Sequence, residues 1–170
     1  MTKKSKTAAV ILAAMILLCG CSAAGKAEKD STAASAGTEN KADISAEELL
    51  ADISSENLDG RICKGDGMYD KNAAKFYGTG FANIIDGAIL YNENGGYADE
   101  VSAVKFDESI DGQELLKDRL ESRTASFRDY RPEEVGKLEK AKIFSAGGFD
   151  ILIISDDADT IEKQIRDKLS

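Results

Sequence analysis

The sequence predicts an α+β fold in which helices pack on an antiparallel four-stranded sheet built from two hairpins. Three observations predict this fold class. Two pairs of apolar segments are each joined by a short loop that contains two glycines, which is typical of β-hairpins. One long segment with a helical apolar stripe separates the two pairs. Two hairpins separated by a helix favour an antiparallel sheet with helices packed on it.

The folded part of the chain is expected to be a single globular domain over residues 43–170. The preceding segment, residues 22–41, contains no large apolar side chain, so it cannot bury enough surface to offset the loss of chain entropy. We therefore expect residues 21–42 to form a disordered tether. The remaining length is enough for one hydrophobic core and too short for two.

The first helix of the domain is expected to begin after Ser45. Ser45 and Glu48 have the spacing of a capping box, and Ile44 and Leu49 have that of a hydrophobic staple. A second short helix is expected over residues 69–76, and the chain between the two helices is expected to form loop and turn.

Four segments are expected to be strands. Residues 84–91 and 100–106 form the first hairpin, and residues 140–146 and 149–155 form the second. The last of these segments contains the most apolar stretch of the domain. We therefore expect it to be the central strand of the sheet.

The longest helix is expected over residues 112–130. It should end before Pro132, because the residue that precedes a proline avoids the helical region. Pro132 can then begin a short helix, since a proline costs little in the first turn. A final helix is expected over residues 160–169. Three acidic residues before or within its first turn are expected to cap it: Asp156, Asp157 and Asp159.

The N-terminal 20 residues have the pattern of a secretion signal. Three lysines, Lys3, Lys4 and Lys6, precede an apolar run over residues 8–18, and a small residue follows before the expected cleavage point. The run is too short for a membrane-spanning helix, which needs about 20 apolar residues.

The end of this segment, Leu18-Cys19-Gly20-Cys21, resembles the lipobox of bacterial lipoproteins. The resemblance implies that a diacylglyceryl group is attached to the Cys21 thiol and that a signal peptidase cuts between Gly20 and Cys21. Cys19 is the poorer candidate for lipidation because the bulky Leu18 precedes it. Two acyl chains hold a protein firmly in a membrane. The expected location is the extracytoplasmic face of the cell membrane, with an uncleaved membrane anchor as the alternative.

Several pieces of the folded part resemble a family of small lipoproteins of unknown function from Gram-positive anaerobes. These pieces occur in the same order and at similar spacing, and they are residues 76–78, 98–101, 104–106, 116–120, 130–133 and 147–156. The resemblance covers about 100 residues, from residue 68 onward. It implies no activity and identifies no catalytic residue.

Two arginines in the longest helix are the candidate binding residues. With 100° per residue and Leu116 at zero, Arg123 lies at about −20°, in the middle of the apolar stripe, and Arg119 lies at about −60°, at its edge. An unpaired buried charge is expensive. Arg123 is therefore expected to pair with a buried acid or with backbone carbonyls. The alternative is that Arg119 and Arg123 line a groove that binds an anionic or carboxylate-bearing group.

The composition limits the chemistry. The chain has no histidine, which removes the commonest general base and metal ligand. Without the N-terminal signal, 19 of the 22 basic residues remain against 31 acidic ones, so the net charge falls from −9 to −12. Such a charge argues against nucleic acid as a partner.

Cys63 is expected to be a small buried side chain. The three acids before the last helix lack the spacing of a calcium loop. We expect no metal and no cofactor.

These observations favour a membrane-anchored binding domain over an enzyme. Its expected partner is an envelope protein or glycan, and the membrane itself is contacted through the lipid on Cys21. One alternative is a small hydrolase of envelope carbohydrate that uses paired carboxylates. The other is a substrate-capturing lipoprotein of a transporter.

Overall fold

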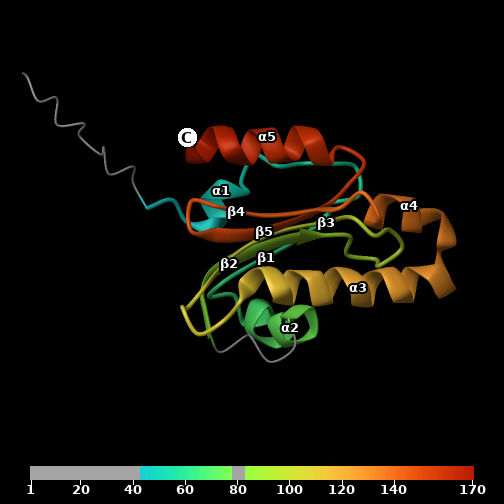
Figure 1. Ribbon diagram of the computed structural model, residues 1–170, viewed down its shortest axis with the longest axis horizontal. Coiled ribbons are helices and arrows are strands. Elements are labelled where there is room, and N and C mark those ends of the chain that lie inside the picture. The colour runs from blue at the N-terminus through green and yellow to red at the C-terminus, as the bar shows by residue number, and fades with distance from the viewer. Residues whose placement is uncertain (1–42, 78–82) are drawn as a thin grey trace, which may run out of the picture. The chain divides into compact units, whose positions relative to one another are not determined.

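The computed structural model of the protein describes residues 43–77 and 83–170 (Figure 1). The expected signal peptide, Gly20, Cys21 and the expected tether lie outside these residues. Among the residues that are described, no helix is both long enough and apolar enough to cross a membrane.

The described domain is built on one five-stranded antiparallel sheet with the strand order β1-β2-β3-β5-β4. The strands are β1 (Gly60–Cys63), β2 (Ile84–Tyr91), β3 (Glu100–Phe106), β4 (Lys142–Ala146) and β5 (Phe149–Ile154). The α+β class is confirmed, but the expected number of four strands is wrong. Both expected hairpins are present, and they meet where β3 pairs with β5.

The additional strand is β1, which pairs with the outer edge of β2. Its four residues are too few to show an alternating apolar pattern, and Arg61 interrupts them. Gly60 lies opposite Tyr91 in the pairing. A Cβ atom at Gly60 would come within 2.8 Å of the Tyr91 ring, so the close approach of this strand requires glycine.

Helices cover both faces of the sheet (Figure 1). On one face lie α1 (Ala46–Leu49) and α5 (Ala158–Leu169), and on the other lie α2 (Gly67–Tyr77) and α3 (Gly112–Tyr130). The short α4 (Val135–Leu138) lies beside the end of the sheet and contributes Leu138 to the core under α2 and α3. Each face has its own hydrophobic core. The sheet is therefore the middle layer of three.

The two cores explain the irregular apolar pattern of β3. Val101 and Ala103 point into the core under α1 and α5, whereas Val104 points into the core under α2 and α3. All three side chains are fully buried. β3 is also the middle strand of the sheet, so the expectation that residues 149–155 form the central strand is wrong. β5 is next to the centre, and it is more apolar than β3 although helices cover both strands on both sides.

Two helices begin at the caps that local sequence signals predict, whereas α5 does not. Ser45 and Glu48 form the expected capping box at α1, and Asp111 caps α3 through the backbone N–H of Glu114. The acids before α5 do not act as caps as expected. Asp157 precedes that helix without a capping hydrogen bond from its side chain.

The first and last helices are in direct contact. The Nζ atom of Lys168, near the end of α5, donates to the carbonyl oxygens of Glu48 and Leu49 at 3.0 and 3.2 Å. Lys168 also forms an ion pair with Asp52 at 2.9 Å. The last helix therefore satisfies carbonyl groups that the short α1 leaves without partners inside the helix.

Candidate functional site

A buried carboxylate at the start of β3 binds both predicted arginines of α3. Glu100 is fully buried. Nε and Nη2 of Arg119 donate to its two carboxylate oxygens at 3.2 and 2.7 Å, and Nε of Arg123 lies 3.4 Å from Oε2. The two-pronged arrangement of Arg119 is the strong form of such a pair. It fixes α3 against the middle strand.

Arg123 makes a second contact with the same region of the chain. Its Nη2 atom donates to the carbonyl oxygen of Ala98 at 2.8 Å, and its Cζ atom lies 5.2 Å from the centre of the Phe127 ring. Burial lowers the pKa of Arg123, and the charge of Glu100 opposes that shift. Arg123 thus has both of the partners expected for a structural role, an acid and a carbonyl group.

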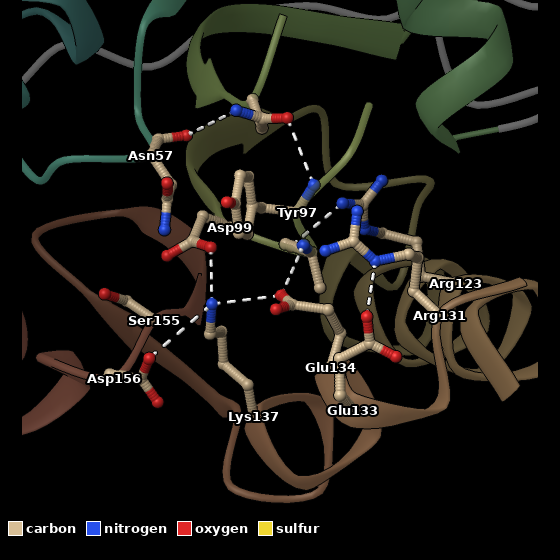
Figure 2. Close-up of polar contacts among 12 residues, drawn as sticks. Asn57, Tyr97, Asp99, Arg123, Arg131, Glu133, Glu134, Lys137, Ser155 and Asp156 are labelled. Carbon is tan, nitrogen blue, oxygen red and sulfur yellow. Dashed lines mark hydrogen bonds and ion pairs between the residues drawn. The ribbon is translucent and has the colours of Figure 1, made fainter. Parts of the chain in front are cut away.

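A second charged cluster lies beside the first and centres on Lys137 of α4 (Figure 2). Its Nζ atom lies 2.6 Å from Asp99, 3.0 Å from Glu134 and 3.6 Å from Asp156. Lys137, Asp99 and Glu134 are all buried. Burial alone would lower the pKa of Lys137, but the hydrogen bonds to Asp99 and Glu134 outweigh it and raise the pKa above its usual value.

The two clusters together fix residues 97–100, which we call the pinned segment. The backbone N–H of Tyr97 donates to Oδ1 of Asn92 at 3.1 Å. The N–H of Ala98 donates to Oε2 of Glu134 at 2.9 Å, and its carbonyl oxygen accepts from Arg123. Side chains from three separate parts of the fold therefore hold the backbone that carries Tyr97.

The pinned segment presents an aromatic side chain to solvent. Tyr97 is 41% exposed and Tyr130, at the end of α3, is 62% exposed. Arg131 follows Tyr130 in the chain, and its Cζ atom lies 5.3 Å from the centre of the Tyr97 ring and its Nε atom 2.6 Å from Glu133. We call Tyr97, Tyr130, Arg131 and Glu133 the tyrosine surface. Figure 2 shows three of them close together.

The contacts place both tyrosines at the same end of the domain. The Tyr130 ring packs against that of Phe127 at 5.9 Å, Phe127 contacts Arg123, and Arg123 binds the carbonyl group next to Tyr97. Arg131 provides a second connection between the two tyrosines, because it follows Tyr130 in the chain and its side chain contacts the Tyr97 ring. Tyr97 and Tyr130 are therefore linked through Phe127, Arg123 and Ala98.

A groove of about 410 Å³ lies between α2 and α3. Arg119 lines it with Phe76, Tyr77 and Asp118, and the Arg119 guanidinium lies 4.2 Å from the centre of the Phe76 ring. The sequence analysis left open that Arg119 and Arg123 both line an anion-binding groove. Arg119 does line a groove, whereas Arg123 points to the pinned segment.

A more polar pocket of about 570 Å³ adjoins the start of α3, and Asp111 and Asp150 are among its lining residues. Asp111 caps α3, and Asp150 accepts a hydrogen bond from Ser145. Both carboxylates are thus engaged in holding the fold, and Glu108 lines the same pocket.

Cys63, Asp156 and Asp159, the other residues singled out in the sequence, are buried or paired with lysines. Cys63 is buried, as expected, and burial raises the pKa of its thiol. Asp156 contacts Lys137 and Asp159 contacts Lys142. Over residues 43–77 and 83–170, no group of three or more Cys, Asp or Glu side chains could hold a metal ion.

Sequence reasoning missed the pinned segment and the tyrosine surface. One signal was available, because Arg123 in the apolar stripe of α3 required an acid on the facing sheet. Asp99 and Glu100, at the start of an apolar strand, were the acids in a suitable place. Nothing in the sequence pointed to Lys137 as the partner of Asp99, since the two belong to elements far apart in the chain.

Comparison with known families gave one match. The family described as "Domain of unknown function (DUF4358)" matches residues 66–155, which include the tyrosine surface and all residues of the two charged clusters except Asp156. Comparisons with curated proteins and with solved structures found no match.

Proposed function

The chain belongs to the DUF4358 family, and we propose that it is a lipid-anchored binding domain on the extracytoplasmic face of the cell membrane. The proposed anchor is a diacylglyceryl group on Cys21, and the proposed partner is a component of the cell envelope. The binding face in this proposal is the tyrosine surface.

The location rests on the N-terminal sequence. A positively charged start, a short apolar run and Leu18-Cys19-Gly20-Cys21 occur in the order that lipoprotein export and lipidation require. Cleavage after Gly20 would leave 22 residues, 21–42, between the lipid and the described domain. A flexible segment of this length has a root-mean-square reach of about 25 Å, which allows the domain to approach partners near the membrane.

The binding function rests on one observation, the exposed Tyr97 carried by the pinned segment. Tyrosine and arginine are enriched at protein interfaces, and exposed aromatic side chains on a fixed backbone lose little entropy when they bind. Tyr97, Arg131 and Tyr130 combine both residue types on one surface. In this proposal Arg123 is a positioning residue, because it holds Ala98 next to Tyr97. Arg119 contributes by holding Glu100 and by lining the groove between α2 and α3.

The anchor is tested with two matched substitutions, Cys21→Ser and Cys19→Ser, each in the full chain expressed in a bacterium that processes lipoproteins. We expect Cys21→Ser to abolish labelling with a fatty-acid probe and to leave the membrane fraction, because the lipid attachment atom is lost. Cys19→Ser should behave like the wild type. Labelling and membrane retention of Cys21→Ser would contradict the proposed anchor.

The binding face is tested by cross-linking in cells. A photoreactive amino acid at position 130 should yield discrete adducts of the full chain, whereas the same amino acid at position 85 should not. Ile85 is a suitable control because it is 56% exposed and does not belong to the tyrosine surface. Equal yields of the same adducts at both positions, or none at position 130, would contradict the proposed face.

A further inference from the structure

We propose that the outer edge of β4 pairs with the same edge of a second copy of this chain, so that the two sheets join into one. This inference goes beyond the proposed function and does not depend on the tyrosine surface. It rests on the place of β4 in the sheet, on the backbone groups that its edge exposes and on the way in which those groups match the same groups of a second copy.

β4 lies at one end of the sheet. It pairs with β5 on one side, and among residues 43–77 and 83–170 no strand pairs with its other side. None of its residues is fully buried, and Ser145 is exposed. An unpaired edge of this kind is a row of backbone N–H and C=O groups that can pair with another strand.

The hairpin between β4 and β5 decides which groups of β4 point outward. The two glycines of its loop, residues 147–148, have positive φ of 59° and 81°, as in a type I′ turn. The closing pair, Ala146 and Phe149, is therefore hydrogen-bonded, and such pairs alternate with non-hydrogen-bonded pairs along the ladder. Ile143 and Ser145 belong to the non-hydrogen-bonded pairs, so their backbone N–H and C=O groups point away from β5, toward the open edge.

β4 lacks the usual devices that keep other strands away from an edge. It contains no proline, and its register with β5 is regular, without a bulge. Its one charged residue, Lys142, is paired through Nζ with Asp159 and Glu162 of α5. At the opposite edge of the sheet, by contrast, the N–H of Cys63 in β1 donates to Asp66 at 3.0 Å. β4 is therefore the more open of the two edges.

The outward groups of β4 match those of a second β4 in antiparallel orientation. When two copies pair about a twofold axis at Phe144, Ile143 of each copy lies opposite Ser145 of the other, and both pairs are hydrogen-bonded. All outward N–H and C=O groups of Ile143 and Ser145 then have partners. No like charges lie opposite each other, because Lys142 of each copy faces Ala146 of the other. The two Phe144 side chains face each other in a non-hydrogen-bonded pair, where side chains approach more closely.

The oligomeric state of the full chain tests the inference. Sedimentation equilibrium in a density-matched detergent, at a micelle concentration well above that of the protein, should show a monomer that associates to a dimer. The net charge of −9 opposes the approach of two copies, so added salt should strengthen the dimer. A chain that stays monomeric up to roughly 100 μM would overturn the inference.

Two substitutions at one position separate the backbone contact from the side chain. Ser145→Pro removes an outward N–H and leaves the ladder between β4 and β5 intact, since this N–H does not donate to β5. Each dimer contains the change twice, so we expect dimerisation to weaken by at least about tenfold. Ser145→Ala removes the hydroxyl that contacts Gln113 and Asp150 but keeps the N–H, and it should dimerise like the wild type.

Thermal unfolding shows whether each variant is folded. If Ser145→Pro does not fold, Ser145→Lys takes its place with the same expected result, because a lysine on an edge strand opposes pairing. Equal dimerisation of the wild type and the Pro or Lys variant would overturn the inference.

Disulfide trapping tests the register. Full chains with Ile143→Cys and full chains with Ser145→Cys, carrying different tags and expressed in the same cells, should form a mixed disulfide dimer under mild oxidation. Opposite residues of a hydrogen-bonded pair lie about 5.5 Å apart at Cα, which suits a disulfide. Either variant alone should form several-fold less dimer, and equal yields would overturn the proposed pairing.

Other occupants of the edge give different results. If the wild type is monomeric and a photoreactive amino acid at position 145 cross-links to a different protein in cells, the edge binds an extended segment of that protein. If the same amino acid cross-links only within one chain, the edge binds a segment of this chain, such as residues 21–42. Either result would overturn pairing with a second copy, and neither bears on the tyrosine surface.

Discussion

Glu100 is a buried carboxylate whose loss of solvation is offset by ion pairs with two arginines of α3. A carboxylate removed from water loses several kcal/mol of solvation, and a salt bridge recovers this only when its geometry is good and its hydrogen bonds are satisfied. Glu100 meets that condition with Arg119, through two hydrogen bonds, whereas the buried Nε atom of Arg123 lies 3.4 Å away without a hydrogen bond. Replacing all three side chains with apolar ones can leave a domain equally stable, but removing Glu100 alone leaves both arginines in the interior without their counter-charge.

We expect Glu100→Gln to lower the free energy of unfolding by about 3 kcal/mol, because the side chains of Arg119 and Arg123 are only 13% and 17% exposed and lose their counter-charge. Urea unfolding followed by circular dichroism measures the change. Glu114→Gln is the matched control, since its pair with Lys117 is exposed and should contribute less than about 1 kcal/mol. Equal effects of the two substitutions would contradict a structural role for Glu100.

The sequence could show that Arg123 needed a partner but not which one. A position on an apolar stripe follows from helical periodicity alone, whereas the identity of the partner depends on how α3 crosses the sheet. For the same reason the sequence does not predict the ion pair between Lys137 and Asp99. The sequence does not predict the fixed position of Tyr97 either, because side chains from other elements hold the backbone there.

At the scale of elements, α2 packs against the sheet through a glycine. The hydroxyl of Tyr69, a fully buried residue of α2, occupies the space next to Gly87 in β2 where a side chain would otherwise lie. The glycine is therefore required by close packing, because its own φ is not positive. This contact sets how closely the helix approaches the strand.

Gly87→Ala should destabilise the domain by about 1–3 kcal/mol, because the added methyl group would overlap the Tyr69 hydroxyl and force the helix or the strand to move. Gly136→Ala is the control. Gly136 lies in α4, and a Cβ atom there would meet nothing within 4 Å, so this change should be neutral or stabilising by up to about 1 kcal/mol. Thermal unfolding of both variants measures the difference, and destabilisation by Gly136→Ala alone would refute this account.

Elements with strong local signals were predicted well. The expected bounds of β2, β3 and α3 agree with the structure, because apolar pattern, hairpin loop and proline stop all act within a few residues. β1 has no such signal, and its existence depends on the free edge of β2, which is remote in the sequence. Likewise, the apolar run of β5 revealed burial on both faces but not its place in the strand order.

The whole domain is a sheet between two helical layers, and acidic groups on its surface contribute to its stability. The pKa of Glu48 is lowered by hydrogen bonds from Ser45, that of Glu133 by backbone and side-chain hydrogen bonds that include Arg131, and that of Glu162 by Lys142 and Arg166. A lowered pKa in the folded state means that folding favours the ionised form. The contribution is therefore present above pH 4.5 and is lost as the pH falls through the folded value.

We expect the urea midpoint of unfolding to be lower at pH 3 than at pH 6, since the three carboxylates must be protonated in the acidic sample. Glu162→Gln should reduce the difference between the two midpoints, because that side chain no longer titrates. Glu47→Gln, a change at an exposed residue of α1, should leave the difference closer to that of the wild type. A midpoint that is unchanged or higher at pH 3 would contradict this assignment.

The contact between α5 and α1 has a consequence for how the chain matures. Lys168 and Glu48 are 120 residues apart in sequence, so α1 leaves the ribosome long before the helix that completes its side of the core. Such distant contacts form late, because a long loop must close first. The core on that face of the sheet therefore stays open until α5 has been synthesised. We expect full resistance of this face to proteases only after α5 has docked on it.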